Sequence, residues 1–191
     1  MVGSKTTTTN RPLKKTLLLV AITFTVGASF SSMLGFVLNS TNDTEFCSGC
    51  HSMQWSYQQL QETSHWKNRS GMHAGCADCH VPRELWPRLK TKLAASKDLL
   101  YEITGSINTP EKYEARRWQL ANRVWKEMKE TDSRECRNCH LFEHMDHDKQ
   151  TDSAIKEHSD TDSGKTCIDC HKGIAHKLPD EPNHTGNTEK N

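Results

Sequence analysis

The 191-residue sequence is poor in the side chains from which protein cores are built. Hydrophobic residues make up 34% of the chain and aromatic residues 7%, and the mean hydropathy is −0.80. A chain with this few apolar side chains cannot form a large core by itself. The polypeptide therefore needs another group to pack against. The formal net charge is only +1, and no basic stripe with interleaved aromatic residues occurs. Nucleic acid is therefore not expected as a partner.

Cysteine is absent outside one repeated motif. All eight cysteines lie in four copies of Cys-x-x-Cys-His. This motif binds c-type haem through two thioether bonds, and its histidine coordinates the iron. Zinc ribbons, disulfides and thioredoxin-like centres also use Cys-x-x-Cys, but none of them requires the adjacent histidine. The sequence therefore predicts a tetrahaem cytochrome whose four covalently bound c-type haems supply most of the core. The predicted attachment residues are Cys47, Cys50, Cys76, Cys79, Cys136, Cys139, Cys167 and Cys170, and the predicted proximal ligands are His51, His80, His140 and His171.

Only one long hydrophobic run occurs, near the N-terminus. Residues 1–15 form a polar leader with several basic residues, and residues 16–38 form a stretch of 23 residues without a charge. That length spans a bilayer as a helix and exceeds the apolar region of a typical cleaved signal peptide. We expect an uncleaved anchor in the cell inner membrane, with the basic N-terminus in the cytoplasm and the remaining chain in the periplasm. Gly27 and Gly35 could pack against a second anchor helix, so a homo-oligomer through the anchor is possible.

The rest of the chain divides into a predicted haem domain, residues 39–179, and a polar tail, residues 180–191. The motifs fall into two pairs separated by a longer insert, which suggests two duplicated dihaem halves. Thr109-Pro110 fits the start of a helix in this insert, and Gly105 to Asn108 separates it from a preceding helix. No strand-like alternation is present. The predicted fold is mainly α, with one transmembrane helix followed by a haem-packed domain with extensive loops.

Several segments resemble the NapC/NirT family of membrane-anchored tetrahaem quinol dehydrogenases. They are residues 68–71, 76–82, 95–99, 135–140 and 167–179. The resemblance implies a protein that oxidises a membrane quinol, menaquinol or ubiquinol, and passes electrons to a periplasmic reductase such as nitrate or nitrite reductase. The motifs alone establish only an anchored electron carrier.

The resemblance also implies sixth ligands for the haem irons. His65 matches the family's distal histidine before the second motif, His158 the one before the fourth motif, and His176 the one after it. Met53 matches a methionine that can ligate the first haem in relatives. His73 lies closer to the second motif but has no family counterpart, and His144, His147 and His184 are expected at the surface. Relatives often carry histidine where Arg83 stands, so any role of that histidine is missing here.

A quinol site needs a proton acceptor and a polar group that orients the ring oxygen. By resemblance, Asp98 matches an acidic residue near the first haem and Lys92 matches a lysine of the same pocket. Six positions apart on a straight helix, the two side chains would point about 120° apart, so a shared pocket needs a bend or approach from two sides.

Other functions remain open at this stage. The same chain could carry electrons in the opposite direction and reduce quinone, or it could reduce small oxyanions itself, although no further catalytic constellation is visible. A scaffold role would make the haems structural. Haem potentials, the redox partner and the pairing of distal ligands with haems do not follow from the sequence.

Overall fold

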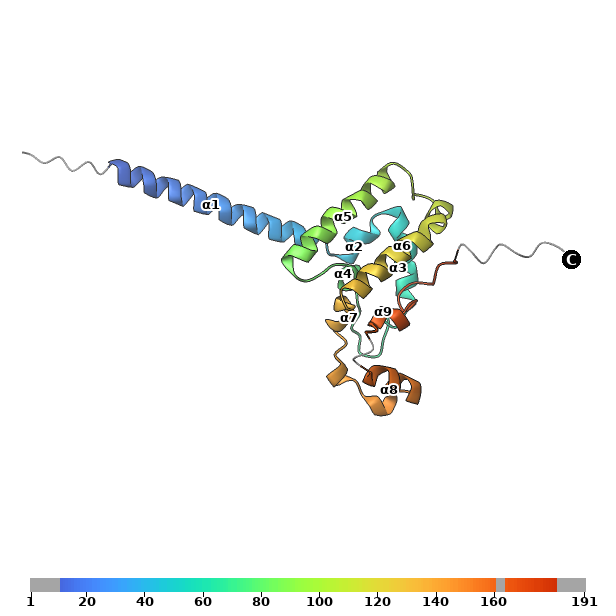
Figure 1. The fold of residues 1–191 in the computed structure, drawn as a ribbon. Helices are drawn as coiled ribbons and strands as arrows, with labels where there is room; N and C mark the ends of the chain where they lie inside the picture. Colours follow the sequence, from blue (N-terminus) through green and yellow to red (C-terminus); the bar gives the residue numbers. More distant parts are fainter. Residues whose placement is uncertain (1–10, 161–163, 182–191) are drawn as a thin grey trace, which may run out of the picture. The chain divides into compact units, whose positions relative to one another are not determined.

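The computed structural model describes residues 11–160 and 164–181 (Figure 1). Every regular element in these two ranges is helical and neither range contains a strand, which confirms the predicted mainly α fold. The chain divides into two compact units, residues 1–41 and 42–191. Most of the predicted leader, most of the predicted tail and His184 lie outside the described residues.

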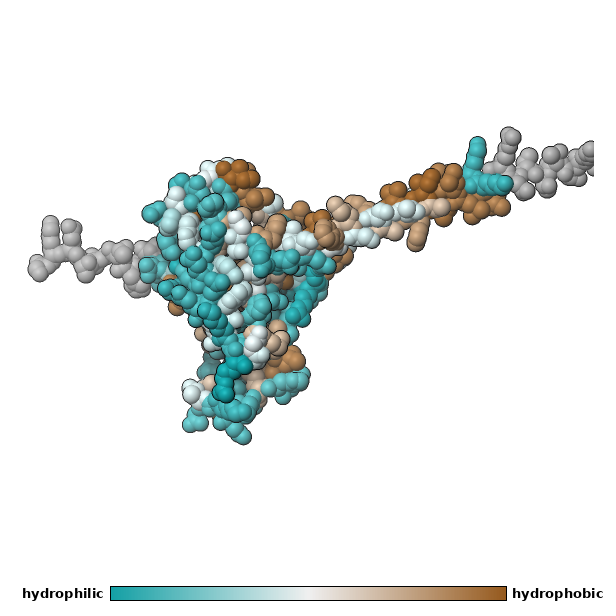
Figure 2. All heavy atoms as spheres, turned by 180° about the vertical axis from the view of Figure 1, so that it is seen from behind, coloured by the Kyte–Doolittle hydropathy of each residue, from teal (hydrophilic) through white to brown (hydrophobic). Residues whose placement is uncertain are grey.

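The first unit consists of one long helix, α1 (Arg11–Ser40). Its segment Pro12–Ser40 has the length and hydropathy needed to cross a membrane, and its most apolar window buries no side chain inside the protein. Hydrophobic side chains accordingly cover most of its surface in Figure 2. The hydroxyls of Thr23 and Thr25 donate to carbonyls one turn earlier, which removes free donors from the apolar stretch. The helix is longer than the predicted span because the flanking polar residues continue the same turn geometry.

The second unit, which we call the C-terminal unit (residues 42–191), begins with three short helices. They are α2 (Thr44–Ser48), α3 (His51–Gln61) and α4 (Cys76–His80). The first Cys-x-x-Cys-His motif spans the junction of α2 and α3, and the second motif forms α4 itself. Helix α2 contacts both α3 and α4, so the first two motifs lie close together.

Two longer helices follow, α5 (Leu85–Ile103) and α6 (Pro110–Glu130). Gly105 lies just beyond the end of α5. Its φ of +69° allows the Ser106 amide to donate to the carbonyl of Tyr101, and the Gly105 amide donates to the carbonyl of Glu102. Helix α6 begins as the sequence predicts, because the Thr109 hydroxyl accepts a hydrogen bond from the Lys112 amide. The predicted two-helix insert and its separator are confirmed.

The remaining elements of the described chain are short. They are α7 (Arg134–Arg137), the 3-10 helices η1 (Phe142–His144) and η2 (His147–Lys149), α8 (Asp152–Ser159) and α9 (Cys167–Cys170). The third motif begins on α7 and continues beyond its end, and the fourth begins on α9, with its histidine directly after the helix. Helix α4 contacts α7, and α6 contacts both α3 and α9, so the first and second halves interleave. The two pairs of motifs therefore do not form the separate dihaem halves that their spacing suggests.

The apolar core of the C-terminal unit is small. Its buried apolar side chains in the described residues are Leu60, Ile107, Tyr113 and Ile168. Tyr113 contacts the ring of Trp55 at a centroid distance of 5.1 Å, and its hydroxyl lies 2.6 Å from that of Ser56. These contacts join α6 to α3. A core of this size agrees with the expectation that the haems fill most of the interior.

Candidate haem-binding and electron-input sites

The second and fourth motifs use their own aspartate to start their helix. Asp78 accepts a hydrogen bond from the amide of Gly75 at 2.8 Å, and Asp169 accepts one from the amide of Thr166 at 2.9 Å. Each carboxylate thereby satisfies a donor at the N-terminus of a one-turn helix that could not form alone. This local cap fixes the two cysteines and the histidine of each motif in one turn.

Neighbouring motifs are tied together by polar contacts. The Thr44 hydroxyl accepts from the amide of Cys76 at 3.4 Å, and the buried hydroxyl of Ser133 accepts from the amide of Ile168 at 3.1 Å. The thiols of Cys47 and Cys76 are hydrogen-bonded to each other, and this bond contributes most to raising the pKa of Cys47. The first motif is therefore joined to the second, and the third to the fourth.

Three predicted distal histidines each face one motif histidine. His65 faces His140 with ring centroids 6.2 Å apart, and His80 faces His176 at 6.2 Å. His158 faces His171 at 6.0 Å. A metal–imidazole bond is about 2.0 Å long and the ring centre lies about 1.1 Å behind the nitrogen, so two imidazoles on opposite sides of one iron have centres about 6.2 Å apart. The three ring pairs therefore have the spacing that haem iron requires.

His158 is oriented by a neighbouring amide. Its Nδ1 lies 2.7 Å from the side-chain oxygen of Gln150. Because an amide oxygen only accepts, Nδ1 carries a proton, and in the neutral ring it is then Nε2 that has the lone pair able to bind a metal. Metal-bound histidines in proteins are generally held by such a partner on the second ring nitrogen.

His176 is positioned by the segment that follows the fourth motif. The Gln59 side-chain oxygen accepts from the amide of Lys177 at 2.9 Å and from the Arg117 guanidinium at 2.8 Å. Arg117 also donates to the carbonyl of Lys177. Helices α3 and α6 thus hold this segment in place. Burial lowers the pKa of His176 to about 4, so its ring is neutral at pH 7, the form that coordinates a metal.

The cysteines fit thioether attachment. All eight are free thiols. Among residues 11–160 and 164–181, no group of three or more His, Cys, Asp or Glu side chains is arranged to hold a bare metal ion. Thiols in Cys-x-x-Cys-His turns, with imidazole pairs at the spacing of an axially ligated iron, fit haem better than a zinc site.

The first motif differs from the other three. The His51 side chain is 80% exposed, and no imidazole of the described chain lies opposite it. Met53 is 40% exposed and lies two residues later on α3. Side chains two positions apart on a helix point about 160° apart, so His51 and Met53 cannot approach one iron together without a change in α3. The structure does not pair the two predicted ligands.

A carboxylate that the sequence did not reveal contacts the first motif. Glu102 of α5 accepts from the amide of His51 at 2.9 Å and from the hydroxyl of Ser52 at 2.7 Å. The Glu102 side chain is only 13% exposed, and Ser52 is buried. Glu102 lies one turn after Asp98, so a search for acidic residues on the same helix face would have found it.

Asp98 and Lys92 contact different neighbours. Asp98 forms an ion pair with Arg123 of α6 at 3.3 Å, and its side chain is 25% exposed. Lys92 lies near the first motif, since its positive charge partly offsets the rise in the pKa of the Cys47 thiol. Burial in turn lowers the pKa of Lys92 itself. The structure therefore places Lys92 beside the first motif and Asp98 against α6.

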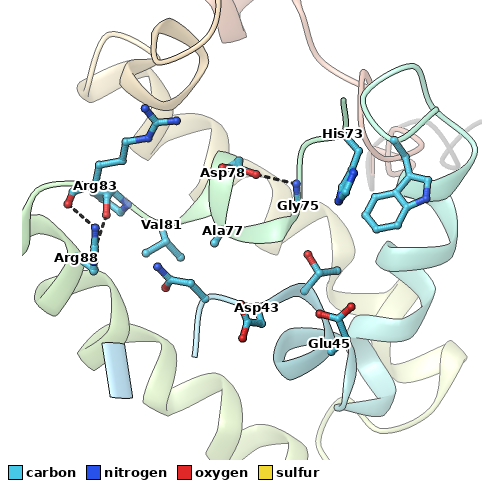
Figure 3. A pocket seen from close by; sticks show the side chains of 13 residues that line it. Asp43, Glu45, His73, Gly75, Ala77, Asp78, Val81, Arg83 and Arg88 are labelled. Atoms are coloured by element: carbon cyan, nitrogen blue, oxygen red, sulfur yellow. Dashed lines mark hydrogen bonds between the residues drawn. The ribbon is translucent and has the colours of Figure 1, made fainter. Parts of the chain in front are cut away.

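A separate pocket of about 420 Å³ lies beside the second motif (Figure 3). Ala77 and Asp78 of the motif line one wall, and Arg88 donates to the backbone carbonyls of Pro82 and Arg83 at its edge. The ring of His73 lies tilted against that of Trp66, with ring centroids 4.7 Å apart, and faces no motif histidine of the described chain. His73 thus contacts an aromatic wall, and neither Lys92 nor Asp98 lines this pocket.

Comparisons with known proteins agree with this geometry. Residues 10–181 match the profile described as the NapC/NirT cytochrome c family, N-terminal region. A protein described as a tetraheme c-type cytochrome from Allochromatium vinosum is 51% identical over 167 residues, covering 87% of this chain and 91% of the relative. The cytochrome c-type protein NapC of Escherichia coli K12 is 48% identical, with coverages of 86% and 82%.

Longer relatives also match. The cytochrome c-type protein TorC of Escherichia coli K12 is 45% identical over 166 residues, which are 86% of this chain but 43% of TorC. The cytochrome c-type protein TorY of Haemophilus influenzae is 47% identical, and the chain spans 42% of its length. No solved structure shows a significant match.

Proposed function

Because this chain belongs to the NapC/NirT cytochrome c family, an electron-transfer family of tetrahaem cytochromes, we propose that it oxidises membrane quinol and delivers the electrons to a periplasmic reductase. Helix α1 anchors it in the inner membrane with the N-terminus in the cytoplasm and the C-terminal unit in the periplasm. The support is the apolar length of α1 and the basic residues at its start. Menaquinol and ubiquinol are both suitable donors, and nitrate or nitrite reductase is the class of acceptor.

The haem ligands follow from the ring pairs. His65 and His140 serve the third motif, His176 and His80 the second, and His158 and His171 the fourth. Bound haem supplies one-electron carriage, and axial ligand type and exposure set its potential. Gln59 of α3 and Arg117 of α6 hold the segment of His176, and Gln150 orients His158.

The first motif is the proposed site of electron input. The observation that carries this proposal is that its His51 has no opposed imidazole among residues 11–160 and 164–181, and that Lys92 lies beside it. Met53 lies on the same helix but points about 160° from His51, so the two could ligate one iron only after a change in α3. A haem with one axial ligand would be more sensitive to its surroundings than a haem with two, and a substrate ring could approach it.

Quinol oxidation releases two electrons and two protons, so the input site needs groups that orient the ring and take up protons. Lys92 can donate a hydrogen bond to a quinol oxygen, and Asp98 can accept a proton. Asp98 is held by Arg123 at 3.3 Å, so proton uptake requires this ion pair to loosen. Glu102 does not act on the substrate in this scheme and instead fixes the backbone of the first motif.

The test uses full-length protein with four haems and a water-soluble menaquinol analogue. Asp98→Asn removes a proton acceptor at constant size, and Lys92→Met removes the charge and donor but keeps the stem. Both variants should be reduced by menaquinol at least about tenfold more slowly, since general acid–base groups contribute about 10²- to 10⁴-fold. Reduction by dithionite, which needs no quinol pocket, should be unchanged.

Arg123→Gln is the matched control for the ion pair. It breaks the Asp98–Arg123 contact but leaves the carboxylate in place. If Asp98 acts as a proton acceptor, Arg123→Gln should keep or raise the menaquinol rate while Asp98→Asn loses it. Equal losses in the two variants would assign Asp98 a structural role. Unchanged rates in both Asp98→Asn and Lys92→Met would place quinol oxidation elsewhere.

A further inference from the structure

Helix α5 carries an exposed apolar stripe along its whole length. The side chains of Trp86, Leu93 and Leu100 are 78%, 74% and 57% exposed. They are spaced by seven residues and therefore share one face of the helix. Leu85 and Ile103 extend the stripe on one side and are also exposed. Figure 2 shows hydrophobic side chains at the upper edge of the C-terminal unit, over the C-terminal half of this helix.

The lysines next to the apolar stripe and the acidic residues of α5 lie on different faces of the helix. Lys90 and Lys97 are exposed and lie within about 40° of Trp86 around the helix axis, beside the apolar stripe. The acidic residues of α5 are Asp98 and Glu102, and both point to the opposite face, where they contact Arg123 and the first motif. The exposed face of α5 is therefore apolar and basic, without a carboxylate.

We propose that α5 lies in the interfacial layer of the membrane that anchors the chain, with Trp86, Leu93 and Leu100 at the boundary with the acyl chains. Lys90 and Lys97 then contact anionic phospholipid head groups. Apolar side chains on one face with lysines beside them, and a tryptophan at the end, are the features of helices that lie in this layer. Each lysine near an anionic surface adds to the attraction.

Two observations favour the membrane over a protein as the partner of this face. The anchor helix α1 ends at Ser40 and the C-terminal unit begins at residue 42, so the bilayer is tethered to this unit by the backbone itself. A second copy docking through the same stripe would bring Lys90 and Lys97 close to their own counterparts, and like charges at an interface oppose association. Anionic lipid head groups provide the opposite charge.

The membrane contact of α5 would determine how substrate reaches the first motif. Lys92 lies on the other flank of the stripe, about 100° from Leu93 around the axis, and next to the first motif. With the stripe at the acyl boundary, Lys92 lies at the level of the head groups, where the polar ring of a membrane quinol resides. The membrane contact of α5 itself does not depend on which donor the protein uses.

The experiment is photocrosslinking of full-length protein with four haems in liposomes that contain phosphatidylglycerol. A benzophenone amino acid replaces Leu93 in one variant and Ala95 in another, which is exposed on the same helix but points about 160° away. Intact mass after irradiation should show a phospholipid adduct at position 93 in several-fold higher yield than at position 95. Equal yields, an absence of lipid adducts at 93, or a crosslinked dimer would overturn the proposal.

The lysines provide a second, independent readout. Lys90→Gln with Lys97→Gln leaves the apolar stripe intact but removes the proposed contacts with anionic lipid. In the parent, the yield at position 93 should fall when phosphatidylglycerol is replaced by phosphatidylcholine. In the double variant the adduct yield at position 93 should be the same in both lipids. A yield that still falls without phosphatidylglycerol would contradict the role of the lysines. Haem content and dithionite reduction serve as checks that each variant is folded.

Discussion

Replacement of Glu102 tests whether a buried carboxylate holds the first motif in place. The carboxylate accepts from the amide of His51 and from the hydroxyl of Ser52, at 2.9 and 2.7 Å. Hydrogen bonds to a charged group contribute about 1.5 to 3 kcal/mol each, and Ser52 is buried, so its hydroxyl would lose its partner. Glu102→Ala should therefore lower the free energy of unfolding by about 3 to 5 kcal/mol.

Glu102→Gln separates the hydrogen bonds from the charge. The glutamine oxygen can accept from the amide of His51, and its NH₂ group can donate to the Ser52 hydroxyl after that hydroxyl rotates. Only the charge assistance and the interaction with the N-terminus of α3 are lost, about 0.5 to 1.5 kcal/mol. Glu114→Ala is the control, because Glu114 is exposed and its ion pair with Arg117 should change stability by less than about 1 kcal/mol.

Urea unfolding of the full-length protein in detergent, followed by tryptophan fluorescence, measures these differences. Haem quenches tryptophan in the folded state, so unfolding should raise the signal. The order of stability should be parent, then Glu102→Gln, then Glu102→Ala, with Glu114→Ala close to the parent. A Glu102→Ala variant as stable as the Glu114→Ala control would refute the reasoning.

Two other predictions concern the haems. Intact mass should correspond to four covalent haems on a chain that keeps residues 16–38, and a mass that lacks a haem or the first 38 residues would count against the assignment. His65→Ala, His158→Ala and His176→Ala should each convert one low-spin haem to high spin in visible and EPR spectra, because each removes an imidazole that lies opposite a motif histidine. His147→Ala, outside these ring pairs, should leave the spectra unchanged, and parent-like spectra in all three distal variants would show that the ligand assignment is wrong.

The sequence was sufficient for features that depend on local patterns. The Cys-x-x-Cys-His motifs, the apolar run and the helix start at Thr109 each depend on residues a few positions apart, and the structure and family comparison confirm the haems, the anchor helix and the mainly α fold. Helix α1 extends beyond the predicted span of residues 16–38 because polar flanking residues continue a helix without adding to its hydropathy.

Features that depend on long-range contacts did not follow from the sequence. The spacing of the motifs suggested two halves, but His65 faces His140 and His80 faces His176, across those halves. Glu102 was missed because its partners are about 50 residues earlier in the chain. The ion pair of Asp98 with Arg123 could not be expected either, because it depends on how α5 packs beside α6.

The crossing of the histidine pairs has a consequence for how the chain matures. With iron between the rings, His65–His140 closes a loop of about 75 residues and His80–His176 closes one of about 96 residues, and each closure removes about 4 to 5 kcal/mol of chain entropy from the unfolded state. The second loop begins inside the first and ends beyond it. In a chain whose N-terminus stays in the cytoplasm while the residues after the anchor cross the membrane in order, His80 would arrive long before His176. The haem of the second motif would then gain its distal ligand only when the last residues of the domain are delivered. A chain truncated before His176 would leave the haem of the second motif with one axial ligand, whereas a chain truncated after Pro179 would keep both ligands.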